Sequence, residues 1–460
     1  MKFTLLVFLT FQIVSAQVFD KENIKVSGDD NKRINLVILS EGYQATEFSK
    51  FIEDATIFSN ALFSQSPFKE YADYFNVYAL KVPSVESGTD HPATATDVTE
   101  PVFPQASTDT YFDSSFDSSG VHRLLYTYNS SAIYSVLANN IPEYDQAIIL
   151  VNTSEYGGGG GAYAVASTGN YADELAIHEL GHSLFDLNDE YYPGDTRARE
   201  SINMTQETSP SAVRWKNWIN DNGVGVYPYG SIGSAATWNR PHQRCKMRYL
   251  GDPFCSVCKE GIIEKIHSLV SPINSFIPDN TTIETPTFPL DFELDLIKTI
   301  PNTLENSWTL NTQEIANNVD NVSLVENDLL EGTNILTTSI EDKTTALRID
   351  NHYNIHIYTI TWTINYDVLS VLDIESEVNN FFISLYPNPS NTVVNLKVES
   401  DYNENIKVDI VALDGKKLKS VSLLNFQTNQ IDISDLSTGV YLTNIYSGNR
   451  LISSERLVKN

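Results

Sequence analysis

The pattern of hydrophobic residues changes near residue 270, and this change limits the folds that the chain can adopt. Before it, short runs of β-branched and aromatic residues alternate with segments of helical periodicity, as expected for an α/β or α+β domain. After it, residues 271–366 contain strand-like segments without helical periodicity, which predicts a β-sandwich. With 460 residues, the chain is also too long for a single hydrophobic core.

The first region contains recognisable strands and helices. Contiguous apolar residues predict buried strands at 34–39, 76–82 and 146–152. Hydrophobic residues at helical spacing predict amphipathic helices over 46–64 and 173–184. A glycine run, residues 157–161, precedes the alternating residues 162–166, and we expect this strand to form an exposed edge to which an extended substrate could pair.

The N-terminus has the features of a signal peptide. Lys2 is followed by apolar residues 3–14 and then by Ser15-Ala16-Gln17, so the mature chain is expected to begin at Gln17. The apolar stretch is shorter than the roughly 20 residues of a membrane-spanning helix, and no later segment qualifies, so no transmembrane anchor is expected. The formal net charge of −29 argues against nucleic acid as a partner.

The second predicted helix carries the sequence His178-Glu179-Leu180-Gly181-His182. Histidines four residues apart lie on one face of a helix, so both imidazoles can bind a single Zn²⁺ ion. Glu179 follows the first histidine, where its carboxylate can act as a general base. The five-residue pattern also occurs by chance, but Gly181 and the downstream carboxylates favour a catalytic zinc site.

A third zinc ligand is expected after the helix. Asp189 is the first carboxylate after the predicted chain reversal and is our choice, with Glu190 as the alternative. Asp186, closer to the helix end, is interpreted as a capping or surface residue. Tyr191, or its neighbour Tyr192, is a candidate for stabilising the transition state through its hydroxyl.

Two other features could involve metals or cross-links. Cys245, Cys255 and Cys258 favour one disulfide between Cys245 and one member of the pair, and a second zinc site is the weaker interpretation. The acidic loop 86–91, which ends at His91, could bind Ca²⁺ or could form a turn held by its own side chains.

The chain resembles the IgA-peptidase family of metzincin-type zinc metallopeptidases. The matching residues form an ordered series: 35–39, Glu41-Gly42-Tyr43, 75–78, 87–92, Tyr144-Asp145, 151–153, Tyr156-Gly157-Gly158 and 178–191. The resemblance implies a zincin-like fold with zinc on His178 and His182, catalysis by Glu179 and a carboxylate from residues 189–191 as third ligand. It also makes Met247 a candidate methionine turn beneath the zinc, although an ordinary core methionine would fit as well.

The last segment resembles a type-A C-terminal sorting domain of the type IX secretion system. The similarity lies in Ser384-Leu385-Tyr386-Pro387-Asn388-Pro389, Leu413-Asp414-Gly415 and residues 431–441. It implies export through the periplasm and outer membrane of a Bacteroidetes-like bacterium, with the type IX machinery as a partner. The product would be secreted or attached to the cell surface.

Five segments are therefore expected: a signal peptide at 1–16, a metallopeptidase domain at 17–270, an Ig-like β-sandwich at 271–370, a linker at 371–380 and a sorting domain at 381–460. The predicted function is secreted zinc-dependent cleavage of proteins or peptides. An alternative is an adhesin or polymer-binding protein with a non-catalytic zincin site. A third hypothesis keeps the hydrolysis and directs it at glycan-bearing proteins.

Overall fold

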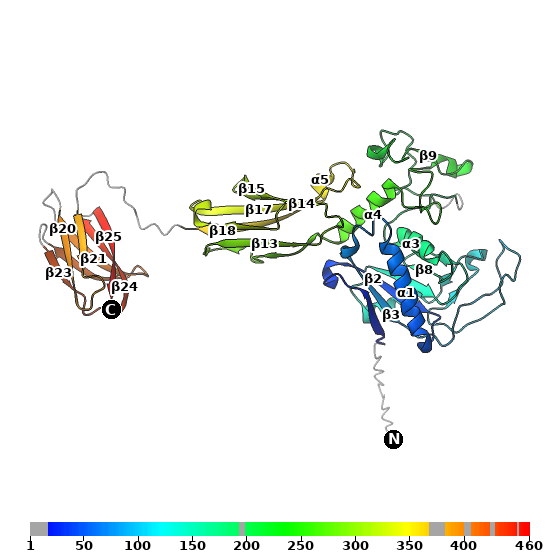
Figure 1. Ribbon diagram of the computed structural model, residues 1–460, viewed down its shortest axis with the longest axis horizontal. Helices are drawn as coiled ribbons and strands as arrows, with labels where there is room; N and C mark the ends of the chain where they lie inside the picture. The colour runs from blue at the N-terminus through cyan, green and yellow to red at the C-terminus, as the bar shows by residue number, and fades with distance from the viewer. Residues whose placement is uncertain (1–16, 193–197, 368–381, 400–405, 424–427, 449) are drawn as a thin grey trace, which may run out of the picture. The chain divides into compact units, whose positions relative to one another are not determined.

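The computed structural model describes residues 17–192, 198–367, 382–399, 406–423, 428–448 and 450–460. Contacts along the chain group into two compact units, Met1–Tyr366 and Asp367–Asn460 (Figure 1). The predicted signal peptide, 1–16, and the predicted linker, 371–380, lie outside the described residues. The domain boundaries within each unit stay predictions.

A six-stranded sheet forms the centre of the first unit. Its order is β1-β3-β2-β6-β8-β7. The strands are β1 Asp20–Lys25, β2 Ile34–Glu41, β3 Phe75–Lys81, β6 Gln146–Val151, β7 Gly158–Gly159 and β8 Ala164–Ala166. The four central strands are parallel, and β1 and β7 pair antiparallel at the two edges. Short pairs join loops beside this sheet: β4 Ser114–Ser115 with β5 Tyr126–Thr127, and β9 Tyr227–Pro228 with β10 Asn239–Arg240.

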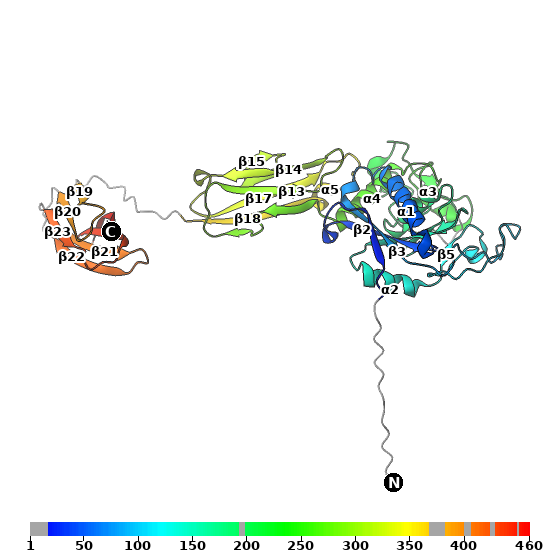
Figure 2. The ribbon, with the colours of Figure 1, turned by 60° about the horizontal axis from the view of Figure 1, so that its bottom comes forward.

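Helices cover both faces of this sheet. On one face lie α1 Phe48–Phe63, α3 Ala172–Ser183 and α4 Ser256–Leu269, whose apolar side chains join those of β2 in one buried cluster. On the other face lies α2 Ser130–Asn140, which packs in a separate cluster (Figure 2). Because both faces are covered, the central strands are mostly apolar, as the sequence predicted.

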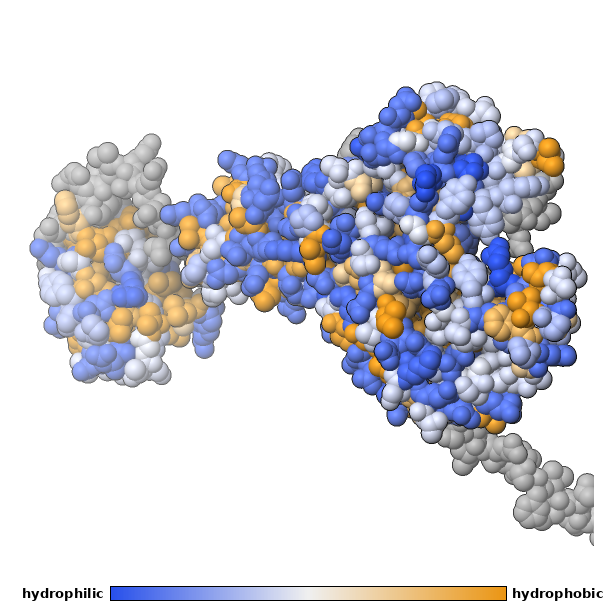
Figure 3. Space-filling model, turned by 45° about the vertical axis from the view of Figure 1, so that its right-hand side comes forward, coloured by the Kyte–Doolittle hydropathy of each residue, from blue (hydrophilic) through white to orange (hydrophobic). Residues whose placement is uncertain are grey.

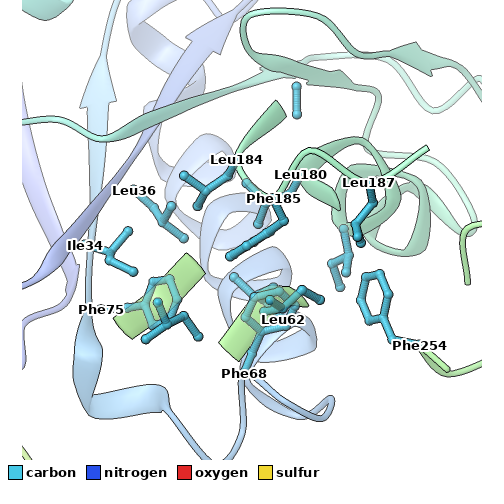
Figure 4. Close-up of a cluster of buried hydrophobic side chains, with 14 of the residues drawn as sticks. Ile34, Leu36, Leu62, Phe68, Phe75, Leu180, Leu184, Phe185, Leu187 and Phe254 are labelled. Carbon is cyan, nitrogen blue, oxygen red and sulfur yellow. The ribbon is translucent and has the colours of Figure 1, made fainter. Parts of the chain in front are cut away.

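The helix that carries the two histidines is held by the larger core. Figure 4 shows Leu180 and Leu184 of this segment facing Leu36 of β2 and Leu62 of α1. The Phe68 ring lies 5.5 Å from that of Phe185, just beyond α3. Close packing on this scale leaves little freedom for α3, so the side chains on its opposite face have defined positions.

The predicted elements agree with the structure, with one exception in the sheet. The strands predicted at 34–39, 76–82 and 146–152 appear as β2, β3 and β6, and the two predicted helices as α1 and α3. The expected exposed edge at 162–166 is wrong, because β8 pairs with β6 on one side and β7 on the other. Beyond β7, the main chain of Gly158 bonds that of Arg123 and Leu125, so the edge is partly covered.

The β-rich remainder of the first unit is a sandwich of two sheets. One sheet has the order β11-β13-β16 and the other β12-β18-β17-β14-β15. Their bounds are β11 Ile273–Ile277, β12 Thr282–Ile283, β13 Leu290–Leu296, β14 Leu304–Leu310, β15 Gln313–Asn317, β16 Asn321–Leu324, β17 Gly332–Asp342 and β18 Ile357–Tyr366, with the short helix α5 His352–Ile355 before β18. Trp308 and Trp362 stack at 5.8 Å in the core between the sheets.

A buried polar network ties this sandwich to the first sheet. The carboxylate of Asp342, at the end of β17, accepts hydrogen bonds from Thr303 at 2.6 Å and from the Tyr71 hydroxyl. It also lies 2.9 Å from Nε2 of His267 on α4. Although burial acts in the opposite direction, these hydrogen bonds hold the pKa of Asp342 below its ordinary value.

Replacing Asp342 by asparagine should destabilise the first unit by about 3 kcal/mol, because the buried groups that contact this carboxylate lose their negatively charged partner. Since the pKa of Asp342 is lowered by folding, its stabilising contribution exists above the ordinary carboxyl pKa and is lost as the pH falls. The D342N variant should therefore lose less stability on acidification than the wild type. Urea unfolding at several pH values measures both effects, and the exposed Asp291 on β13, changed to asparagine, is the control. Equal stability of D342N and D291N would contradict the prediction.

Glu264 on α4 should destabilise the folded chain at neutral pH. Burial, together with repulsion by Glu260 one turn away, raises the pKa of Glu264 to about 7. Between about pH 4.5 and 7 the unfolded chain releases this proton while the folded chain keeps it, so stability falls as the pH rises. The E264Q variant should be more stable than the wild type by about 1 kcal/mol at pH 8, allowing for its partial exposure, and no more stable at pH 4. Thermal unfolding at the two pH values tests this, and a difference that is the same at both would contradict it.

The second unit is a smaller sandwich. Its sheets have the orders β19-β20-β23 and β22-β21-β24-β25. The strands are β19 Phe382–Tyr386, β20 Val393–Glu399, β21 Ile406–Ala412, β22 Lys417–Leu423, β23 Thr428–Asp432, β24 Gly439–Ser447 and β25 Arg450–Lys459. Gly415 and Gly448 have φ of 81° and 61° in turns between consecutive strands.

Hydrophilic residues predominate on the face shown in Figure 3, with hydrophobic ones scattered among them. Among the described residues, no helix has both the length and the apolar character that a membrane span requires.

Candidate metal centre

The helix α3 presents two histidines one turn apart, His178 and His182. Its first turn carries Asp173 and Glu174, whose negative charges favour the positive end of the helix dipole. Its apolar side, which includes Leu175, Ile177 and Leu180, is buried against the core. His178 is also nearly buried, with 5 % of its surface exposed. The helix therefore turns both imidazoles towards the loop that follows it.

Three ligand atoms converge beside α3. One carboxylate oxygen of Asp189 lies 3.0 Å from Nε2 of His178 and 3.2 Å from Nε2 of His182, and the two nitrogens are 3.2 Å apart. In a tetrahedral zinc site with ligands at about 2.0–2.1 Å, two ligand atoms are about 3.3 Å apart. Two imidazoles and one carboxylate are also a donor set that zinc accepts. The arrangement therefore fits a zinc ion with three protein ligands.

Main-chain carbonyls fix the orientation of both rings. Nδ1 of His178 donates to the carbonyl of Lys246 at 3.0 Å, and Nδ1 of His182 donates to the carbonyl of Leu187 at 2.6 Å. A carbonyl can only accept, so the proton of each neutral ring sits on Nδ1 and Nε2 keeps its lone pair. This is the tautomer that a metal bound at Nε2 requires.

The chain reversal after α3 separates the three carboxylates that the sequence offered. Asp189 joins the histidines, whereas Glu190 is fully buried and turns into a different cluster with the cysteines. Asp186 adopts φ of 53°, a left-handed conformation common at helix ends, and its side chain is 66 % exposed and pairs with Arg199 at 2.6 Å. The geometry thus groups Asp189, and not its neighbour, with the two histidines.

A methionine packs beneath the helix at Gly181. Met247 is fully buried, and a Cβ at position 181 would lie 2.9 Å from its sulfur. The amide of Glu190 also donates to the carbonyl of Met247 at 2.7 Å. The absence of a side chain at Gly181 therefore allows Met247 to approach the helix closely. A methionine turn at Met247 stays a prediction.

Glu179 faces the glycine-rich segment that follows β6. A Cβ at Gly160 would lie 2.2 Å from Oε2 of Glu179, so a side chain at this position would displace the carboxylate or the loop. Burial raises the pKa of Glu179, while the neighbouring His178 and His182 act in the opposite direction. A carboxylate with a raised pKa beside a metal site is typical of a general base.

A cavity of about 210 Å³ opens next to Glu179. It is lined by Arg123, Tyr156, Leu175, His178, Glu179, Tyr191, Lys246, Arg248 and Leu250. Burial raises the pKa of Tyr191, whose oxygen also accepts a hydrogen bond from Arg123. Sequence reasoning missed Arg123, because it belongs to no motif and approaches the site only through the fold. Tyr156 belongs to the matching series, but no role in the site was predicted for it.

Three other predicted features can be compared with the structure. The disulfide is not formed, and Cys245, Cys255 and Cys258 are buried free thiols. In the loop 86–91, Glu86 and Asp90 accept hydrogen bonds from the main-chain amides of Asp109 and Thr108, so these side chains join the loop to another segment. Calcium binding stays a prediction. The loop's His91 pairs with Glu155, away from the zinc ligands named above.

Comparison with known protein families supports a peptidase that carries an export signal. Residues 23–231 match the family described as IgA Peptidase M64, and residues 384–460 match the secretion system C-terminal sorting domain. Both resemblances seen in the sequence are thus confirmed. The sorting domain indicates type IX export to the cell surface or the exterior in Bacteroidetes. Met247 and the three cysteines lie beyond the residues matched to the peptidase family.

No curated protein matches the chain. Among solved structures, dimeric latent PorU from Porphyromonas gingivalis is 10 % identical, with a TM-score of 0.16, over 41 % of this chain and 20 % of that one. A β-glucuronidase from Parabacteroides merdae is 9 % identical, with a TM-score of 0.16, over 49 % and 28 %. Two fibronectin type-III domains of chicken tenascin are 13 % identical, with a TM-score of 0.15, over 37 % and 93 %. The chain thus spans less than a third of the first two structures.

Proposed function

We propose that this chain is a secreted zinc-dependent endopeptidase, with zinc held by His178, His182 and Asp189. The observation that carries the proposal is the convergence of their three ligand atoms within 3.2 Å of one another, beside Glu179 and the cavity next to it. Three protein ligands leave a position for water or substrate, which is typical of catalytic rather than structural zinc. The peptidase family of residues 23–231 supports the same reaction.

Glu179 is the proposed general base. When bound, zinc would lower the pKa of a water to about 7 and polarise the scissile carbonyl. Glu179 takes a proton from the attacking water and then delivers it to the amine that leaves, so the carboxylate is regenerated in each cycle. The lack of a side chain at Gly160 leaves space for this carboxylate in its present position.

Tyr191 and Arg123 are the proposed stabilisers of the negative charge that develops on the carbonyl oxygen. Both line the cavity that also exposes Glu179, and they are hydrogen-bonded to each other. Their partnership would keep the phenol oriented before the substrate arrives, which lowers the cost of reorganisation in the transition state.

Removal of the metal tests the proposal. Treating the purified chain with a zinc chelator should abolish cleavage of a panel of unfolded and glycosylated proteins, and about one equivalent of Zn²⁺, but not of Ca²⁺, should restore it. D189N should lose zinc at this site and activity together. D186N, which removes an exposed carboxylate three residues earlier, should keep both. Zinc retained by the wild type without cleavage of any substrate would contradict the proposal and favour a binding protein.

A further inference from the structure

A second group of ligand side chains lies apart from the two histidines. Cys245 precedes Met247, Cys255 is the residue before α4, and Cys258 lies in its first turn. With Glu190 they form a fully buried set whose ligand atoms all lie within 4.8 Å of one another. The sulfurs of Cys245 and Cys258 are 3.6 Å apart, and the sulfur of Cys258 is 3.3 Å from Oε1 of Glu190.

We propose that Cys245, Cys255, Cys258 and Glu190 bind a structural zinc ion. At zinc–sulfur and zinc–oxygen distances of about 2.3 and 2.0 Å, tetrahedral geometry separates two sulfurs by about 3.8 Å and a sulfur from an oxygen by about 3.5 Å. The observed separations lie within about 0.2 Å of these values. A Cys-x-x-Cys pair at a helix start is a frequent zinc-binding element, and thiolates favour zinc over calcium or magnesium. Four protein ligands close the coordination shell, so this ion would not react with substrate.

The carboxylate of Glu190 gives independent support. Its Oε1 accepts hydrogen bonds from Asn203 at 3.1 Å and from the Cys258 thiol, but its Oε2 is buried and has no partner among the described residues. Arg240 bonds the main-chain oxygen of Glu190 and not its carboxylate. A fully buried carboxylate is costly unless a cation or enough donors compensate it. A zinc ion between Glu190 and the three sulfurs would supply that charge.

A disulfide is the competing interpretation, because the export route is oxidising. It would join two of the three sulfurs and leave both the third thiol and the Glu190 carboxylate buried without a new partner. The amide of Cys255 already donates to the sulfur of Cys245 at 3.3 Å, an arrangement that stabilises a thiolate. A zinc ion would therefore give a partner to all four buried groups, the three sulfurs and the Glu190 carboxylate, whereas a disulfide would involve only two of the sulfurs.

The proposed ion would also position the ligands of the candidate catalytic zinc. Glu190 is the neighbour of Asp189, and Cys245 is the neighbour of Lys246, whose carbonyl holds the ring of His178. The amide of Glu190 donates to the carbonyl of Met247, so the two segments are already joined. This positioning role rests on the proposed function, but the existence of the second site does not.

Zinc content and thiol state of the full secreted chain test the inference. The wild type should contain about two zinc ions, and H182A and C255S should each contain about one. After unfolding in the presence of a chelator, all three cysteines should react with iodoacetamide. One reactive cysteine would indicate a disulfide, and three reactive cysteines with zinc bound only through His182 would indicate an ordinary thiol cluster. Either result would overturn the inference.

Further measurements keep the test independent of folding and of the peptidase proposal. The cobalt-substituted wild type should absorb in the near ultraviolet through sulfur-to-cobalt charge transfer. A spectrum without this band would overturn the inference. This measurement does not depend on whether C255S folds. E190Q, which keeps the side-chain volume, should release the second zinc to a chelator at least about tenfold faster than the wild type, and equal release would also overturn it. If the wild type held one zinc ion, and C255S lost it while H182A kept it, the result would support the cysteine site and contradict the catalytic zinc site.

Discussion

Replacing Glu179 by glutamine should lower kcat/KM for a protein substrate by about 10³-fold while the zinc content stays unchanged. Glutamine keeps the shape of the side chain but cannot accept the proton of the attacking water, and general-base catalysis typically contributes about 10²–10⁴-fold. The zinc ligands are untouched, so binding of the metal and the thermal midpoint should match the wild type. Cleavage of a labelled peptide, together with zinc analysis of the same sample, measures both quantities.

The matched control for this variant is D173N, which removes another carboxylate from the same helix without approaching the histidines. It should retain nearly all of the activity. If E179Q cleaved substrate at the wild-type rate with its zinc in place, Glu179 would not be the base and the proposed mechanism would fail.

Replacing Gly160 by alanine should reduce kcat/KM by about 10²-fold. The Cβ of an alanine would lie 2.2 Å from Oε2 of Glu179, far closer than a nonbonded contact allows, so either the carboxylate or the loop must move. A displacement of about 1 Å at a catalytic group can cost about 10²-fold in rate. Most of the loss should appear in kcat, because the displaced carboxylate acts in the chemical step.

The neighbouring Gly161 provides the control, since a Cβ at that position would meet no atom within 4 Å. G161A should therefore cleave substrate like the wild type. Thermal unfolding of both variants separates a local displacement from a loss of the fold. Equal activity of G160A and G161A, with both folded, would show that the contact with Glu179 does not matter.

Local patterns determined the elements around the site. The strand β2 and the helices α1 and α3 could be predicted because each buries apolar side chains whose spacing is visible within one short stretch of sequence. The relation between His178 and His182 followed from helix geometry alone, since four residues make about one turn. In the same way the turns at Gly415 and Gly448 follow from the two residues that form each.

Predictions that depended on distant segments went less well. The strand 162–166 was expected at an edge, but β7 adds a further strand beyond it, and alternation in a short run does not reveal its neighbours. A cross-link between two of the cysteines was expected, but all three are free thiols, and Glu190 joins their cluster from a loop more than fifty residues earlier. No spacing rule relates these residues.

The sequence by itself determined the two families, the candidate zinc ligands on α3 and the neighbouring base, because these depend on residues within one helix or one ordered series of motifs. Only the tertiary structure separated Asp189 from Glu190, brought the carbonyl of Lys246 to His178, and placed Gly160 against Glu179. The physical reason is that side chains adjacent along an irregular segment can point in opposite directions. Their positions depend on the packing of the whole domain and not on local periodicity.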